Sequence, residues 1–137
     1  MRLMPCLLLI SAVAQADVMA SNAWVGEVPL GSPVAAVYLS LHNTGPAAVS
    51  LRGITSPQAG HVMWHATMQH QGMRHMQHRD TVTLAPGERV TLQPGGDHLM
   101  LMDLRQPLRL GDSVALTLDF AGATPVRVLA PLRARQP

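Results

Sequence analysis

Histidine and methionine are concentrated in one short segment of this 137-residue chain. Residues 61–78 contain five histidines and four methionines among eighteen positions, namely His61, Met63, His65, Met68, His70, Met73, His75, Met76 and His78. The whole chain has nine methionines and seven histidines beside only two Trp, one Tyr and one Phe. Imidazole nitrogen and thioether sulfur in such quantity are the donors of a soft-metal site. The segment therefore indicates metal binding.

The donors that are present, and those that are scarce, indicate which metal is bound. Thioether sulfur is a poor ligand for zinc, calcium or magnesium, whereas monovalent copper accepts it readily. Carboxylates are few around these donors, with Asp80 just after the segment and Asp97 just before His98, and this argues against a hard cation. The composition therefore favours Cu(I).

A second group of donors follows in the block His-Leu-Met-Leu-Met at residues 98–102. If this block is a strand, alternate side chains point to opposite faces, so Leu99 and Leu101 share one face. The other face then carries His98, Met100 and Met102, with neighbouring members roughly 7 Å apart. One imidazole and two thioethers are thus expected on one side of a single strand.

The elements that must position these donors are short runs rich in Val, Leu and Thr, separated by Gly and Pro. No segment from Asp17 onward has helical periodicity. The runs predict strands near residues 18–25, 34–42, 49–54, 62–68, 81–84, 89–92, 98–104, 113–120 and 126–130. Strands at this spacing, with no helices between them, favour an all-β Greek-key sandwich or barrel formed by one domain over residues 17–137.

The donors also follow a known spacing. Ten residues separate His65 from Met76, and a further twenty-one separate Met76 from His98-Leu99-Met100. This arrangement resembles the His-x10-Met-x21-His-x-Met signature of the PCuAC-like periplasmic copper chaperones, which serve the CuA centre of cytochrome c oxidase. The blocks Ala23-Trp24-Val25, Tyr38–Asn43 and Pro94–Met102 agree with it, so the likeness covers nearly all of residues 17–130.

The resemblance implies a cupredoxin-like Greek-key fold, with Cu(I) held near one end of the sandwich by His65, Met76, His98 and Met100. It also implies a copper-accepting partner, such as a cytochrome c oxidase subunit or another copper-transfer protein. Two features depart from the family. Ala66 follows the first histidine where the family often has Met, and residues 131–137 lack the Met/His-rich tail of several members. A second copper site on such a tail is therefore not expected.

The other histidines of the segment leave alternatives open. His61, His70, His75 and His78 are either solvated residues or an auxiliary site for a second copper ion as Cu(II), which prefers imidazole nitrogen. Several ions held in this way would favour an alternative function, a periplasmic copper store for copper tolerance. An enzyme is disfavoured, because a site filled by two His and two Met leaves no open position for a substrate.

The first sixteen residues have the features of a secretory signal peptide. Arg2 precedes the apolar run Leu3–Val13, and Ala14-Gln15-Ala16 supplies small residues before Asp17. Cys6 lies within the apolar run and not at its end, which disfavours lipid attachment at a cleavage site. We therefore expect removal of residues 1–16 and export to the periplasm. Residues 17–137 contain no cysteine, so they offer neither a disulfide nor a thiolate ligand.

Charge and hydropathy disfavour two further classes of protein. The formal net charge is only +2 and the arginines are scattered, so no basic patch for nucleic acid is visible. No run reaches the roughly eighteen apolar residues of a membrane-spanning helix. We expect a monomer that binds no nucleic acid and has no stable membrane insertion after the signal peptide is removed.

Overall fold

The computed structural model describes residues 17–70 and 72–134, which form ten β-strands and no helix. The strands are β1 (Val18–Gly26), β2 (Ala35–Asn43), β3 (Val49–Thr55), β4 (Ala59–His70), β5 (Met73–Arg79), β6 (Val82–Leu84), β7 (Arg89–Thr91), β8 (His98–Leu104), β9 (Ser113–Ala121) and β10 (Val126–Arg133). The all-β prediction is thereby confirmed. Within the described residues, nothing forms a helix of the length and apolarity needed to cross a membrane. The expected signal peptide lies outside the described residues.

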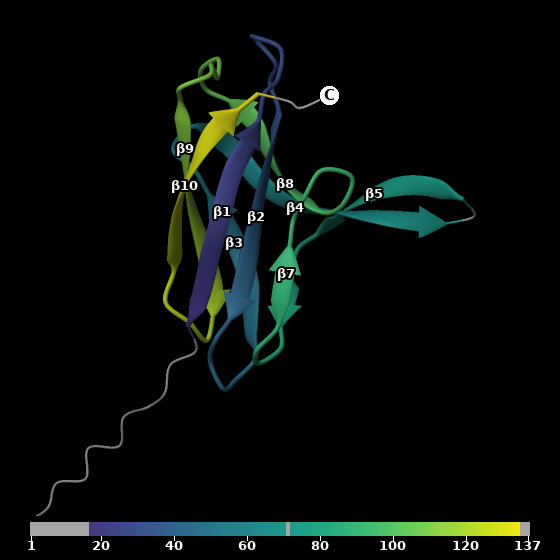
Figure 1. Cartoon of the computed structure of the whole chain (residues 1–137), viewed down its shortest axis with the longest axis vertical. Coiled ribbons are helices and arrows are strands. Elements are labelled where there is room, and N and C mark those ends of the chain that lie inside the picture. Colours follow the sequence, from purple (N-terminus) through teal and green to yellow (C-terminus); the bar gives the residue numbers. More distant parts are fainter. Residues whose placement is uncertain (1–16, 71, 135–137) are drawn as a thin grey trace, which may run out of the picture.

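All ten strands belong to one sheet, in the order β5-β4-β8-β2-β1-β10-β9-β3-β6, with β7 paired to β2. β1 and β10 run parallel, with Val25 beside Leu132, whereas β1 pairs with β2 in the antiparallel sense. The sheet curls so that its two halves face each other (Figure 1). The result is the expected cupredoxin-like sandwich, nearly closed into a barrel.

Alternating apolar side chains fill the space between the two halves. On β9 the buried residues are Val114, Leu116, Leu118 and Phe120, the period-two pattern of a half-buried strand. β2 buries every second residue in the same way. Full burial of one such side chain contributes about 1.5–3 kcal/mol relative to leaving it exposed. Because residues 17–134 contain no cysteine, this core and the strand pairing stabilise the domain without a disulfide.

Strand β4 is longer than the sequence indicated, because it pairs with two different partners. Its first half, residues 59–65, lies against β8, and its second half, residues 64–70, lies against β5. The β4–β5 hairpin therefore projects from the body of the sandwich (Figure 1). His70 is opposite Met73 at the end of the hairpin, and Gly72 has a left-handed φ of 77°. The sequence predicts a turn at Gln71-Gly72, of which Gln71 lies outside the described residues.

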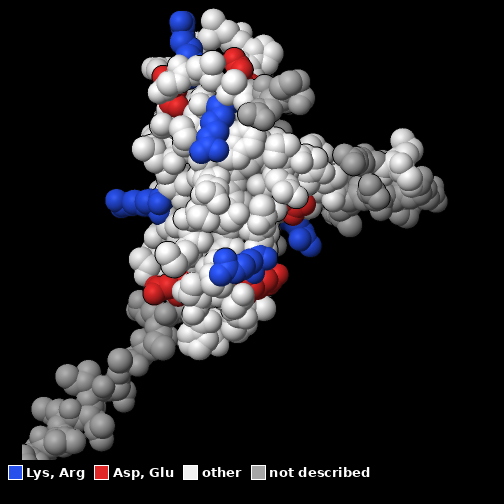
Figure 2. All heavy atoms as spheres, in the orientation of Figure 1, with Lys and Arg blue, Asp and Glu red and all other residues white. Residues whose placement is uncertain are grey.

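Charged side chains are spread thinly over the surface. On the face shown in Figure 2, positively and negatively charged side chains are scattered, singly or in small groups of mixed sign, over a mostly uncharged surface. This distribution agrees with the small net charge of +2. The visible face therefore offers no extended basic or acidic surface.

Candidate metal centre

The outer face of β8 carries three of the donors that the sequence singled out. Leu99 and Leu101 are completely buried in the core. Alternate residues of a strand point to opposite faces, so the face away from the core carries His98, Met100 and Met102. The alternation expected for this strand is therefore present.

β4 presents a matching row of donors across the ladder. The register pairs His61 with Met102, Met63 with Met100 and His65 with His98. Directly opposed residues of an antiparallel pair lie on the same face, with Cβ atoms about 4.5–5.5 Å apart. Three imidazoles and three thioethers thus follow one another along this face of the β4–β8 ladder.

His65 and His98 form the best-defined pair in this ladder. Their ring centroids are 5.5 Å apart and the ring planes are inclined at 70°. His98 is only 4% exposed, and its ring meets that of Tyr38 edge-on at 6.4 Å between centroids. Among the described residues, the buried side-chain nitrogen or oxygen atoms without a hydrogen-bond partner are His65 Nδ1 and His98 Nε2. A buried polar atom left without a partner costs about 1–3 kcal/mol, and both nitrogens are available to a metal ion.

The surroundings of His65 favour the neutral imidazole, which is the form that binds metals. Burial lowers the pKa of His65 below its usual 6.5, and positive charge on His98 or His78 lowers it further. The ring therefore stays unprotonated to a lower pH than that of a free histidine. Protons compete less strongly with a metal ion at this position.

One carboxylate fastens the loop before β8 to strand β4. Asp97 accepts hydrogen bonds from the indole N–H of Trp64 at 3.0 Å and from the backbone N–H of Thr67 at 3.2 Å. The Thr67 hydroxyl donates in turn to the carbonyl of Gly96 at 2.9 Å. Trp64 is 2% exposed, so the first of these bonds lies in packed surroundings. The sequence did not predict this role for Asp97, because nothing in the spacing of Trp64 and Asp97 indicates that they are in contact.

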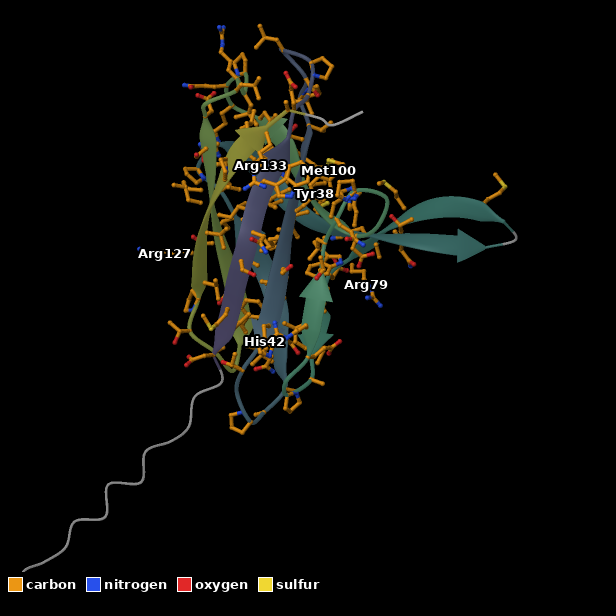
Figure 3. All side chains as sticks on the ribbon, in the orientation of Figure 1. Tyr38, His42, Arg79, Met100, Arg127 and Arg133 are labelled. Carbon is orange, nitrogen blue, oxygen red and sulfur yellow. The ribbon has the colours of Figure 1, made fainter. Side chains whose placement is uncertain are left out.

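Met100 lies beside the histidine pair on the body of the sandwich. Its neighbours in register are Met63 on β4 and Ala36 on β2. Figure 3 shows Met100 next to Tyr38, which follows Ala36 by two positions on the same face of β2. The Met100 side chain is half-buried. The structure thus brings together three of the four predicted ligands, His65, His98 and Met100.

The fourth predicted ligand, Met76, lies on the projecting hairpin. It is opposite Thr67 and 60% exposed. It shares the face of His65 but stands two residues farther out, roughly 7 Å along the strand. His78 is the β5 residue directly opposite His65, with ring centroids 6.2 Å apart. The register therefore places His78, which the sequence left without a definite role, nearer to His65 than Met76.

The remaining histidines lie at other levels of the ladders. His61 Nε2 is 3.7 Å from the carboxylate of Asp103, and both side chains are largely exposed. His70 and His75 belong to the outer part of the hairpin, opposite Met73 and Met68. Within residues 17–70 and 72–134, no three His, Asp or Glu side chains are grouped around one point as ready-made ligands.

Comparison with known proteins identifies the family. The sequence model of a protein family described as "LpqE-like: Putative lipoprotein LpqE-like" matches residues 18–132. This chain belongs to the LpqE-like family. The "Putative lipoprotein Lxx21020" of Leifsonia xyli subsp. xyli (strain CTCB07) is 35% identical to it over 121 residues, 87% of this chain and 72% of that protein. The word lipoprotein describes those proteins, and the single cysteine of this LpqE-like chain, Cys6, lies outside the described residues.

Two solved structures similar to this LpqE-like chain are described as copper complexes. The "Copper-bound PCuAC domain from PmoF2" has a TM-score of 0.73 at 25% identity and covers 89% of this chain and 97% of that chain. The structure of "CuI-DR1885 from Deinococcus Radiodurans" has a TM-score of 0.64 at 32% identity and covers 90% and 81%. The resemblance to PCuAC-like proteins that the donor spacing indicated is confirmed, and so is the fold.

Proposed function

We propose that this protein is a copper chaperone that binds Cu(I) through His65, Met76, His98 and Met100. The observation that carries the proposal is the pair of buried imidazole nitrogens, His65 Nδ1 and His98 Nε2, without hydrogen-bond partners on adjacent strands. The copper complexes of the PmoF2 PCuAC domain and of DR1885 support the same metal.

The chemistry of the donors fits Cu(I). Two imidazoles and two thioethers are neutral, so the complex keeps the single positive charge of the ion, and thioether sulfur suits soft Cu(I). His98 and Met100 project from the same face of one strand, which fixes a nitrogen and a sulfur relative to each other. Met76 reaches the ion from the hairpin with a flexible side chain of three rotatable bonds.

Delivery requires release as well as binding. Cu(I) has a filled d shell and no strong geometric preference, so it tolerates three-coordinate intermediates while ligands exchange one at a time. Met76 is the most exposed donor at 60%, and we expect its sulfur to leave first. A thiolate-rich acceptor, such as the CuA centre of cytochrome c oxidase with its two bridging cysteines, then draws the ion away. Copper stays monovalent throughout this exchange.

The proposed place of action is the periplasm. The predicted signal peptide at residues 1–16 supports export, as does the word lipoprotein in the names of the LpqE-like relatives. Four protein donors leave no open coordination position for a substrate. The proposed role is therefore binding and transfer of copper, and not catalysis.

A periplasmic copper store is the second candidate function. The observation that favours it is the exposure of further donors on the hairpin, where Met73 is 64% exposed and the side chain of His78 is 42% exposed. Such donors would hold additional ions outside the main centre. A store binds several equivalents of copper, whereas a carrier binds one.

Anaerobic titration with Cu(I) against a competing chelator separates these functions. We expect one tightly held equivalent, and a loss of affinity of at least about tenfold in His65→Gln, His98→Gln and Met100→Leu. His42→Gln is the matched control. His42 is also on β2, but it lies far from Tyr38, the β2 residue that contacts His98 (Figure 3). Equal losses in all four variants would contradict the assigned ligands. Several equivalents that Met100→Leu leaves intact would favour the store.

Transfer is measured in a second experiment. The Cu(I)-loaded protein is mixed anaerobically with a purified CuA domain whose two cysteines are reduced, and copper in each protein is counted after separation. We expect copper to move to the thiolate acceptor. If the loaded protein kept the ion, it would bind copper without delivering it to CuA, and that part of the proposal would be wrong.

A further inference from the structure

Three histidines occupy the same level on three adjacent strands. The register pairs His78 on β5 with His65 on β4, and His65 with His98 on β8. The ring centroids are 6.2 Å apart in the first pair and 5.5 Å apart in the second. His65 is therefore the middle member of a row of three imidazoles. The spacing motif accounts for His65 and His98 but not for His78.

We propose that His78 is a third imidazole donor of this centre, and that His78, His65 and His98 together form a second donor set that binds Cu(II). This inference rests on the proposed copper function. Cu(II) prefers imidazole nitrogen, whereas thioether sulfur selects Cu(I). Because both donor sets use His65 and His98, the centre holds one ion at a time, and the oxidation state of that ion decides whether methionine or His78 completes the site.

The distances between the rings agree with a shared ion. A metal–nitrogen bond of about 2.0–2.1 Å puts a ring centroid roughly 3.2 Å from the metal. Two rings on one ion then have centroids between roughly 4.5 Å apart at a right angle and 6.4 Å apart in a line. The observed 5.5 Å and 6.2 Å both fall within that range. Each of these two pairs is therefore spaced as two rings on one ion would be.

Asp80 leaves one ring nitrogen of His78 available. His78 Nε2 is 3.3 Å from Asp80 Oδ1, so Nδ1 remains for a metal ion. A carboxylate on the far nitrogen is the usual arrangement of a ligating histidine, because it fixes the tautomer of the ring. The His78 side chain is 42% exposed and can rotate without disturbing the core. Among the described residues the three rings are not grouped around one point, so the proposal requires the His78 ring to move toward His65 when the ion binds.

The test titrates the purified apo-protein with Cu(II) sulfate in air, and with Cu(I) under anaerobic conditions. It compares the wild type with His78→Gln and with His61→Gln, a matched control that removes another exposed histidine beside a carboxylate. We expect His78→Gln to weaken Cu(II) binding by at least about tenfold and to remove one nitrogen from the electron paramagnetic resonance spectrum. Its Cu(I) affinity should not change. Met100→Leu should show the reverse, and His61→Gln should change neither.

A second measurement tests whether the two donor sets share one position. Silver(I) is a d10 ion that replaces Cu(I) without reducing Cu(II), so the protein is loaded with one equivalent of Ag(I) and then titrated with Cu(II). We expect Cu(II) to bind only as Ag(I) is displaced. Simultaneous binding of both ions would overturn the shared site.

The remaining outcomes distinguish this inference from the proposed function. An unchanged Cu(II) affinity and spectrum in His78→Gln would overturn the inference, and so would an equal loss in His61→Gln. Failure of the wild type to bind Cu(I) would overturn the proposed function instead.

Discussion

The indole N–H of Trp64 donates a hydrogen bond of 3.0 Å to the carboxylate of Asp97. Trp64 precedes His65 within β4, and Asp97 precedes His98, the first residue of β8. The bond therefore ties together the two backbone positions from which the paired imidazoles project. The separation of the two rings depends on a contact that neither histidine makes.

Replacing Asp97 with asparagine should loosen this connection. An amide has one acceptor oxygen, so either the Trp64 indole or the Thr67 backbone N–H is left without an acceptor. We expect the free energy of unfolding to fall by about 1–3 kcal/mol. The Cu(I) affinity should fall by about 10–100-fold, as when a ligating histidine loses the group that orients it. Denaturant titration and chelator competition measure the two effects.

The matched control for Asp97→Asn is Asp119→Asn. Among the described residues, the side chain of Asp119 makes only an exposed ion pair with Arg52 at 3.9 Å, so its loss should leave stability and copper affinity nearly unchanged. Full stability and full affinity in Asp97→Asn would show that this carboxylate does not hold the loop.

The lowered pKa of His65 predicts a specific pH dependence of the apo-protein. Because the folded pKa lies below 6.5, the unfolded chain takes up a proton first as the pH falls. Stability should therefore decrease from pH 6.5 down to the lowered pKa, with no contribution from this residue at higher pH. Denaturant titrations between about pH 5 and 8 should show a shallower dependence in His65→Gln than in the wild type. Identical slopes in the two proteins would contradict this account.

Oxidation with dilute peroxide tests the thioether on the hairpin. Met76 is 60% exposed whereas Met100 is half-buried, so Met76 should become the sulfoxide first. A sulfoxide is a poorer ligand for Cu(I), and we expect the affinity to fall as Met76 is converted. Peptide mass spectrometry follows the conversion, and chelator competition follows the affinity.

Met73 provides the internal comparison for that experiment. It is 64% exposed on the same hairpin and has no place in the predicted ligand set. The variant Met73→Leu should lose Cu(I) affinity under peroxide just as the wild type does. Met76→Leu should start with a lower affinity and be far less sensitive. Tight binding by a protein in which Met76 is fully oxidised would remove Met76 from the ligand set.

A side chain at Gly60 should disturb the ladder that carries the donors. A Cβ added there would stand 2.9 Å from the Cβ of Asp103, which itself has a left-handed φ of 54°. Gly60→Ala should therefore cost about 1–3 kcal/mol of stability and weaken Cu(I) binding by forcing β4 and β8 apart. Gly53→Ala, where a Cβ meets nothing within 4 Å, should be neutral or slightly stabilising. Thermal unfolding of the two variants measures the difference, and equal stabilities would refute the clash.

The sequence predicted those features that depend on local pattern. Alternation in β9 and β8 is a property of consecutive residues, so Val114 and Leu99 could be assigned to the core without knowing their partners. The pairing of His78 with His65 could also have been predicted from the sequence. A two-residue turn at 71–72 sets His70 opposite Met73, and counting back along both strands sets His78 opposite His65.

Other features depend on contacts between distant segments and could not be predicted in this way. β4 is long because it pairs with both β5 and β8, and nothing in the sequence of β4 itself indicates either partner. The Trp64–Asp97 bond joins residues 33 positions apart and has no local pattern. The ligand role of the four donors and the removal of residues 1–16 stay predictions.

The parallel pairing of β1 with β10 also decides when the protein can fold. Val25 pairs with Leu132, so the second edge of β1 is covered only when β10, near the end of the described chain, has been made. Contacts between residues so far apart must close a large loop first, which slows folding. A chain that stops before Val126 would leave β1 and β9 each with a bare edge, and bare edges recruit other strands into aggregates. β10, the last strand made, therefore closes the sheet between β1 and β9.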